Sequence, residues 1–172
     1  DRKPDYIAVA FDLKGPTFRD EVYESYKANR APTPDALIPQ IPFIKDVVRG
    51  FSIPVIEKEG IEADDLIATL AKKYAEKGIK VFIVSGDKDF LQMVSEDITV
   101  VDTMKDRVYD IDGVKGRFGV APEKVVDVLA LTGDASDNIP GVPGIGDKTA
   151  QRLIAEFGSL EEVMGHLDGI KN

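Results

Sequence analysis

Two short runs of apolar, partly β-branched residues, at positions 7–11 and 80–84, predict buried β-strands. A weaker run at positions 98–101 predicts a third strand. Between the first two strands, apolar residues recur at helical spacing on two successive faces: Phe18, Val22 and Tyr26, then Ile41, Ile44, Val47 and Val48. The alternation predicts an α/β fold with a mostly parallel central sheet flanked by helices.

The clearest helix is predicted at residues 62–77, where apolar residues recur on one face and Gly78 provides a stop. Another helix is predicted at residues 122–131, with proline in its first turn. After it the chain shows glycine-punctuated helices and no strand. We therefore expect an α/β core in residues 1–120 and a helical subdomain in residues 121–172.

The composition narrows the chemistry of any metal site. The chain has no cysteine and a single histidine, His166, so it contains neither a thiolate zinc site nor a histidine cluster. A metal would have to be held by oxygen atoms, which favours magnesium or manganese over zinc or copper.

Acidic residues gather where the predicted elements begin or end. In an open parallel sheet, ligands bind beyond the carboxyl ends of the strands, so we expect acids at these positions to meet in one crevice. Closely packed carboxylates repel one another unless protons or cations compensate them. Two Mg²⁺ or Mn²⁺ ions would do so and would serve an in-line displacement at phosphorus. The candidate ligands are Asp12, Glu62, Asp64, Asp65, Asp87, Asp89, Asp134 and Asp137.

Each acidic group also has a purely structural interpretation. Glu62, Asp64 and Asp65 would favourably meet the dipole of the helix whose first turn they occupy. The aspartates at 87 and 89 suit a turn, and those at 134 and 137 suit a loop or a helix cap. The joint occurrence of all the groups, rather than any one of them, indicates a shared metal site.

A glycine-rich stretch at residues 140–150 precedes a predicted helix. Glycines permit tight turns and leave backbone N–H groups accessible, so the stretch and the helix N-terminus could grip a sugar-phosphate backbone without reading bases. A simple connector between two helices is the alternative. The candidate contacts are Gly141, Val142, Gly144, Ile145, Gly146, Lys148 and Thr149.

A basic arm lies between Lys14 and Pro34, close in sequence to Asp12. Its cations could neutralise phosphates, and its tyrosines could stack an unpaired base. An amphipathic surface helix with solvated charges is the alternative, because acids also occur there. The candidate contacts are Arg19, Tyr26, Lys27 and Arg30.

The formal net charge of −9 is unusual for a nucleic-acid binder. If the eight candidate ligands face two divalent cations, the remaining chain is close to neutral, so the charge does not exclude DNA. No apolar run approaches the length of a membrane span and no leader opens the sequence. We expect a cytoplasmic, monomeric protein without a membrane partner.

Taken together, these motifs resemble the 5′ nuclease, or flap endonuclease, superfamily, and specifically the 5′-to-3′ exonuclease domain of bacterial DNA polymerase I. The resemblance covers nearly the whole chain. It runs through residues 9–12, 18–19, 26–34, 62–65, 86–89, 131–138 and 141–149.

The resemblance implies an enzyme that cleaves DNA at a 5′ flap, nick or 5′ end by a two-metal mechanism, in repair and Okazaki-fragment processing. Acids matching Asp12, Glu62, Asp64 and Asp87 would hold the first metal. Those matching Asp89, Asp134 and Asp137 would hold the second, with Asp65 nearby. It also implies catalytic contacts from Lys27 and Arg30 to the scissile phosphate or the threaded 5′ strand, assisted by Arg19. The glycine stretch would be a helix-three-turn-helix, a helix-hairpin-helix-like clamp on duplex DNA with a bound potassium ion.

The chain departs from the family at its start, where members carry a further strand with a metal-binding aspartate and a following helix. It also stops soon after the glycine stretch, without a polymerase domain. We therefore keep open a truncated, inactive module that binds DNA backbone. Two other classes fit less well. A haloacid-dehalogenase-like phosphatase would need an acid where Lys14 stands, and a PIN-type ribonuclease would not need the glycine stretch.

Overall fold

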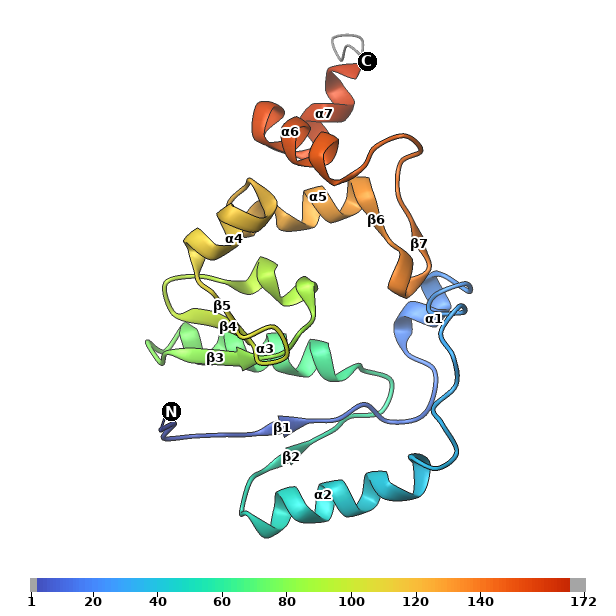
Figure 1. Cartoon of the computed structure of the whole chain (residues 1–172), viewed down its shortest axis with the longest axis vertical. Helices are drawn as coiled ribbons and strands as arrows, with labels where there is room; N and C mark the ends of the chain where they lie inside the picture. Colours follow the sequence, from blue (N-terminus) through green and yellow to red (C-terminus); the bar gives the residue numbers. More distant parts are fainter. Residues whose placement is uncertain (1–2, 168–172) are drawn as a thin grey trace. The chain divides into compact units, whose positions relative to one another are not determined.

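The structure is a computed structural model that describes residues 3–167. The chain divides into two compact units, Asp1–Thr69 and Leu70–Asn172, each of which is described by itself (Figure 1). Helix α3, Ala63–Ala75, begins in the first unit and ends in the second. Its amphipathic pattern and its acidic first turn agree with the helix predicted at residues 62–77.

The first unit is built around a pair of very short parallel strands. Val9 of β1 (Val9–Ala10) pairs with Val55 of β2 (Val55–Ile56). A short helix α1 (Phe18–Val22), a 3₁₀ turn η1 (Ile38–Gln40) and helix α2 (Ile41–Gly50) lie between these strands in the sequence, and α2 contacts β2. Among the described residues of this unit, only Tyr26 and Ala63 are buried apolar side chains.

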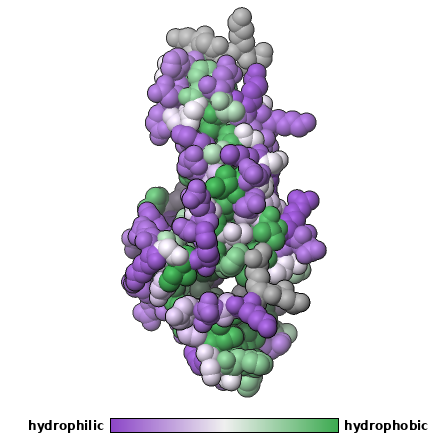
Figure 2. All heavy atoms as spheres, turned by 90° about the vertical axis from the view of Figure 1, so that its left-hand side faces the viewer, coloured by the Kyte–Doolittle hydropathy of each residue, from purple (hydrophilic) through white to green (hydrophobic). Residues whose placement is uncertain are grey.

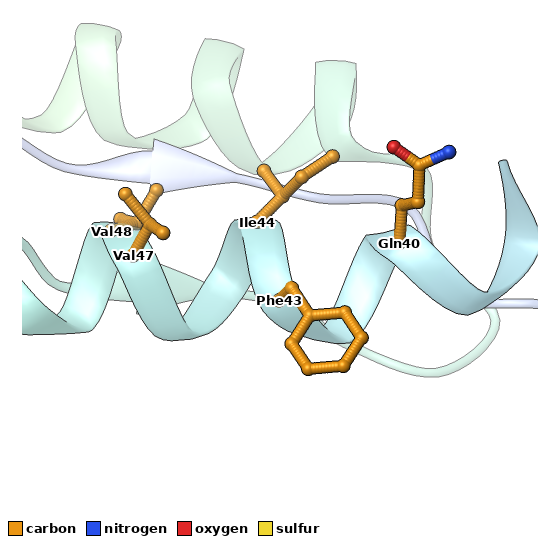
Figure 3. Close-up of a pocket in the computed structure, with 5 residues that line it drawn as sticks. All are labelled: Gln40, Phe43, Ile44, Val47 and Val48. Atoms are coloured by element: carbon orange, nitrogen blue, oxygen red, sulfur yellow. The ribbon is translucent and has the colours of Figure 1, made fainter.

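Helix α2 carries a broad apolar surface that the first unit leaves open. Phe43 is 69% exposed and Val47 is 59% exposed. A shallow apolar pocket runs along the helix, where Gln40, Ile44 and Val48 form a row (Figure 3). In the space-filling view, apolar surface gathers over α2 at the bottom of the picture (Figure 2). The apolar lining of the pocket offers no group for acid–base chemistry.

The second unit contains a three-stranded sheet in the order β3-β4-β5. Strands β3 (Val81–Val84) and β4 (Ile98–Asp102) are parallel, and β5 (Arg107–Tyr109) is antiparallel to β4. The turn η2 (Lys88–Met93) follows β3 and inserts Phe90 and Leu91 into the core. This arrangement places Asp87 and Asp89 just beyond the carboxyl end of β3.

Helices complete the second unit. Helix α4 (Ile111–Phe118) is capped by Asp110, η3 (Pro122–Lys124) leads into α5 (Val125–Thr132), and α6 (Asp147–Phe157) and α7 (Leu160–Gly165) pack with α5. Between α5 and α6 lies a small antiparallel pair, β6 (Gly133–Asp134) and β7 (Ile139–Pro140), joined by η4 (Ala135–Asp137). Val125, Val128 and Leu153 are almost completely buried where these helices meet.

The α/β class and the C-terminal helical part are confirmed, with differences in detail. The described strands form three small sheets rather than one central sheet. The expectation of no strand after residue 133 is wrong, because β6 and β7 pair there. The helix expected to include Phe18, Val22 and Tyr26 ends at Val22, and Tyr26 lies in a following turn.

Candidate metal and nucleic-acid site

The first unit brings one set of candidate ligands to the start of α3. Asp12 follows β1, and its Oδ1 accepts a hydrogen bond from the backbone N–H of Ala63 at 2.7 Å. Asp12 therefore caps the first turn of α3, which also carries Asp64 and Asp65. Asp12 and Asp64 are exposed, so solvent reaches both carboxylates.

The basic arm contacts the same turn. Arg19 donates two hydrogen bonds to Asp65, from Nη1 to Oδ2 at 2.6 Å and from Nη2 to Oδ1 at 2.8 Å. Lys27 Nζ donates to Glu62 Oε1 at 2.7 Å, and the Tyr26 hydroxyl donates to Glu62 Oε2 at 3.1 Å. The structure thus brings predicted DNA contacts and predicted metal ligands together.

These pairs change the proton affinities of the groups involved. The hydrogen bonds from Arg19 hold the pKa of the Asp65 carboxyl below its usual value, and Asp65 in turn raises the pKa of the Arg19 guanidinium. Burial lowers the pKa of the Lys27 ammonium, but hydrogen bonds with Glu62 and Tyr26 outweigh burial and raise it overall. All three side chains are therefore charged at neutral pH.

The backbone of Lys27 is unusual. Its φ of 53° lies in the left-handed region of backbone conformations. Residues other than glycine, asparagine and aspartate seldom adopt this conformation. Lys27 is half-buried, and its ammonium also lies 4.8 Å from the centre of the Tyr26 ring. The sharp turn after α1 thus directs Lys27 back toward Glu62. Arg30, three residues later, is exposed.

The second unit brings together another set of acids. Asp87 Oδ1 accepts from Asp89 N at 2.9 Å and caps η2, and Asp134 Oδ1 accepts from Ser136 N at 2.7 Å and caps η4. Lys88 Nζ lies 3.3 Å from Asp134 Oδ2. The turns after β3 and after β6 therefore present their carboxylates to a shared region.

The charges in this region repel one another. Burial and then the neighbouring charges of Asp87, Asp134 and Asp137 raise the pKa of Asp89, and Lys88 only partly compensates. Burial also acts to raise the pKa of Asp134, but the Ser136 backbone N–H and Lys88 outweigh it and lower that pKa overall. Hard oxygen donors crowded in this way fit a divalent cation such as Mg²⁺ or Mn²⁺. Within residues 3–167, however, no three acidic or histidine side chains are close enough to hold one ion by themselves.

The glycine-rich stretch combines a structural and an exposed part. Gly141 lies against the backbone of residue 132, and Val142 N donates to Leu131 O at 2.8 Å. A turn then brings Ile145 N to Val142 O at 3.0 Å, and Gly146 is the N-cap of α6. Lys148 is exposed in the first turn of α6, and the adjacent Thr149 is half-buried.

Two charged residues without a predicted role, Lys88 and Asp102, form ion pairs in the structure. In the sequence, Lys88 lies between two candidate ligands, Asp87 and Asp89. Its ion pair with Asp134 joins residues far apart in the sequence, so the sequence pattern does not predict it.

Asp102 is the last residue of β4, whereas Asp12 and Asp87 lie beyond the ends of β1 and β3. The buried carboxylate of Asp102 accepts from the backbone N–H groups of Met104 and Lys105 and from Lys105 Nζ, so it closes the turn to β5.

In the described residues, no helix is long and apolar enough to cross a membrane.

Comparisons with known proteins show what this chain is similar to. A family model for the 5′-3′ exonuclease N-terminal resolvase-like domain matches residues 1–119, and one for the 5′-3′ exonuclease C-terminal SAM fold matches residues 120–172. The chain is 47% identical to DNA polymerase I of Caldicellulosiruptor bescii over 176 residues, which cover 99% of this chain and 21% of that protein.

A 5′-3′ exonuclease of Aquifex aeolicus is 46% identical over 162 residues, which cover 94% of this chain and 56% of the relative. Among solved structures, the flap endonuclease of bacteriophage T5, in a pseudo-enzyme-product complex with DNA and metal ions, aligns with a TM-score of 0.82. Its sequence identity is 26%, over 95% of this chain and 64% of that one. The chain therefore spans only part of each of these proteins.

Proposed function

Because the chain belongs to the 5′-3′ exonuclease family, we propose that it is a structure-selective nuclease that hydrolyses DNA phosphodiesters near a 5′ end. The substrates would be a 5′ flap, a nick or a free 5′ end, as in DNA repair and the processing of Okazaki fragments. In the full-length protein, a polymerase domain would follow, as the similarity to DNA polymerase I suggests.

The observation that carries the proposal is the gathering of carboxylates around Asp89 in the second unit, where burial first, and then the charges of Asp87, Asp134 and Asp137, raise the pKa of Asp89. A protein gains no stability from such an arrangement unless a cation occupies it. We propose that Asp87, Asp89, Asp134 and Asp137 hold one Mg²⁺ or Mn²⁺ ion. Asp12, Glu62 and Asp64 would contribute to the other. Since no three described acids suffice alone, water would fill most coordination positions, as Mg²⁺ prefers.

When bound, the cations supply an activated water and positive charge beside the phosphate oxygens. The chain's own residues do the rest. Lys27 and Arg30 bind the scissile phosphate or the threaded 5′ strand, Arg19 supports them, and Tyr26 orients Lys27 beside Glu62. A phosphate that replaces Glu62 as the partner of Lys27 would stay charge-paired in a partly water-excluded site.

The glycine-rich stretch would hold the sugar-phosphate backbone of the duplex. Backbone N–H groups of Gly144, Ile145 and Gly146, together with the start of α6, would bind sugar-phosphate, and exposed Lys148 would add a charge. Thr149 and Val142 would complete this surface, and carbonyl oxygens of the turn could hold a K⁺ ion. Gly141 would shape the turn from within.

The first test is cleavage of a 5′-flap DNA in Mg²⁺, beside an Asp87→Ala, Asp89→Ala double variant and a chelated control. We expect cuts near the flap junction that both controls abolish. DNA that is bound but never cut, even with Mn²⁺, would instead favour the alternative of a DNA-backbone-binding module. Absence of both binding and cleavage would refute the proposal.

A further inference from the structure

Asp65, in the first turn of α3, forms a two-point contact with Arg19 of the basic arm. Both of its carboxylate oxygens accept hydrogen bonds from one guanidinium, at 2.6 and 2.8 Å, in the forked geometry that arginine forms with carboxylates. The side chains of Arg19 and Asp65 are 30% and 29% exposed. A cation at Asp65 would have to displace this pair.

Helix geometry separates Asp65 from Asp64. Adjacent residues of an α-helix do not face each other, because each is rotated by about 100° from the last. If Asp64 points toward a cation, Asp65 in the same turn of α3 points elsewhere. The side chain that it meets belongs to Arg19, 46 residues earlier in the sequence.

The basic arm depends on contacts outside α1, because α1 itself is short and packs weakly. Helix α1 has five residues and buries none of them. Phe18 is 51% exposed and Val22 is 83% exposed, so apolar packing of α1 itself contributes little, although Tyr26 after it is buried. Polar contacts with the first turn of α3, through Arg19 and through Lys27, therefore add to the burial of Tyr26 in attaching the arm.

We propose that Asp65 is not a metal ligand but the anchor of the basic arm, and that the Arg19–Asp65 pair positions Lys27 and Arg30 for DNA. The proposal rests on the proposed nuclease function, within which it divides the acids of α3 into two roles. Asp64 faces the cation, and Asp65 faces the arm. Arg19 and Asp65 are then positioning residues, coupled to each other rather than to the metal.

The two roles predict opposite behaviour for neighbouring substitutions. For Asp65→Asn we expect Mn²⁺ affinity, measured by electron paramagnetic resonance, within about twofold of the unaltered protein. Affinity for 5′-flap DNA, measured in Ca²⁺, should fall about tenfold, because one charge of a half-buried pair loses its partner. Asp64→Asn is the matched control, and it should lose Mn²⁺ affinity instead.

Exchange of the two charges is the decisive variant. Arg19→Asp and Asp65→Arg should each weaken DNA binding, and the double variant should recover most of it because the forked pair forms in reverse. Arg19→Lys, which keeps the charge but loses the fork, should give an intermediate affinity. No reversal could restore a lost metal ligand, so Mn²⁺ affinity lost in Asp65→Asn and unrestored by the exchange would overturn the proposal.

Hydrogen exchange of the basic arm tests the anchoring role of Asp65 independently of the nuclease function. In metal-free protein without DNA, amides of residues 18–30 should exchange faster in Asp65→Asn and in Arg19→Met, and at the original rate in the charge exchange. If the unaltered protein neither binds Mn²⁺ nor cleaves DNA, the nuclease proposal fails, yet this exchange pattern still tests the anchor. Unchanged protection of the arm in both single variants would refute it.

Discussion

At the scale of single residues, Asp89 combines partial burial with like-charged neighbours. Asp89→Asn should therefore stabilise the metal-free protein, by up to about 1 kcal/mol after solvent screening, because an amide costs less to bury than a carboxylate and relieves the repulsion. The same change should abolish the stabilisation that Mg²⁺ gives to the unaltered protein. Thermal unfolding with chelator and with Mg²⁺ measures both effects, and a lower melting temperature in chelator would contradict the expectation.

The raised pKa of Asp89 also determines whether its contribution to folding stability rises or falls with pH. A carboxyl with a raised pKa in the folded state binds its proton more tightly when folded, so its stabilising contribution is fully present below the unfolded value of 3.8 and is lost as pH rises through the folded value. In chelator, the unaltered protein should therefore gain stability from this group as pH falls toward that range. The difference between it and Asp89→Asn should shrink over the same interval.

Lys88 supplies a positive charge among the acids of the second unit. Lys88→Met removes the partner of Asp134, so the metal-free protein should lose up to about 1 kcal/mol of stability. Mn²⁺ should bind several-fold more tightly, since it no longer competes with an ammonium group. Lys88→Arg is the control that keeps the charge. Weaker Mn²⁺ binding in Lys88→Met would show that Lys88 supports the cation rather than competing with it.

The positions of the acids were predictable from the sequence, but their partners were not. Asp12 and Asp87 follow continuous apolar runs that predict strands, so their placement beyond strand ends was expected and is observed. The pair between Arg19 and Asp65 joins residues far apart in sequence, and a pattern of charges in one helix does not show which charge lies across from it. That all eight acids share one site stays a prediction.

At the scale of elements, two glycines decide whether β6 and β7 can pair. A Cβ on Gly133 would lie 2.3 Å from Gly141 N, and one on Gly141 would lie 2.3 Å from Thr132 O. Both obstacles are backbone, which cannot rotate away. The pairing holds the loop that carries Asp134, so these glycines act on the candidate site without touching a ligand.

Gly141→Ala should therefore destabilise the protein by about 1–3 kcal/mol or more, because overpacking forces the backbone apart. Gly146→Ala is the matched comparison, since a Cβ there meets nothing within 4 Å and its φ is −97°. We expect it to unfold within about 0.5 kcal/mol of the unaltered protein. Chemical denaturation of the two variants measures the contrast, and equal stabilities would show that the strand pair adapts.

Sequence patterns predicted the long amphipathic helices and missed several of the short elements. Helices α2, α3 and α5 show clear apolar faces, whereas β2 and β6 have two residues each, too few for a period to be recognised. The pairing of β6 and β7 depends on a close backbone approach rather than on side-chain alternation. Helix α4 was missed because two glycines interrupt its short sequence.

At the scale of the whole molecule, the two units differ in how much apolar surface they bury. Nearly all of the fully buried side chains lie in the second unit, among them Val100, Val114 and Val125. The first unit exposes Tyr6, Phe43 and Phe51. A segment with few buried contacts opens at low free energy, so the first unit should be the less protected one.

Native-state hydrogen exchange provides the measurement. Amides of β1 and β2 should exchange at least about tenfold faster than those of β4 and α5, because opening the latter requires exposing the core of the second unit. Protease digestion should cut first between residues 27 and 60. Equal protection of both units would contradict the expectation and would mean that the apolar surface of α2 is covered in solution.

The contact between Gly133 and Gly141 also bears on how this sequence can evolve. The two backbones touch and leave no room for a side chain. Substitutions of either glycine should therefore be selected against even in a relative that has lost its activity. If glycine is invariant at either position among relatives, packing alone explains it. At Gly146, where open space and an ordinary φ would admit alanine, invariance among relatives would instead record selection by something outside the chain that approaches its backbone.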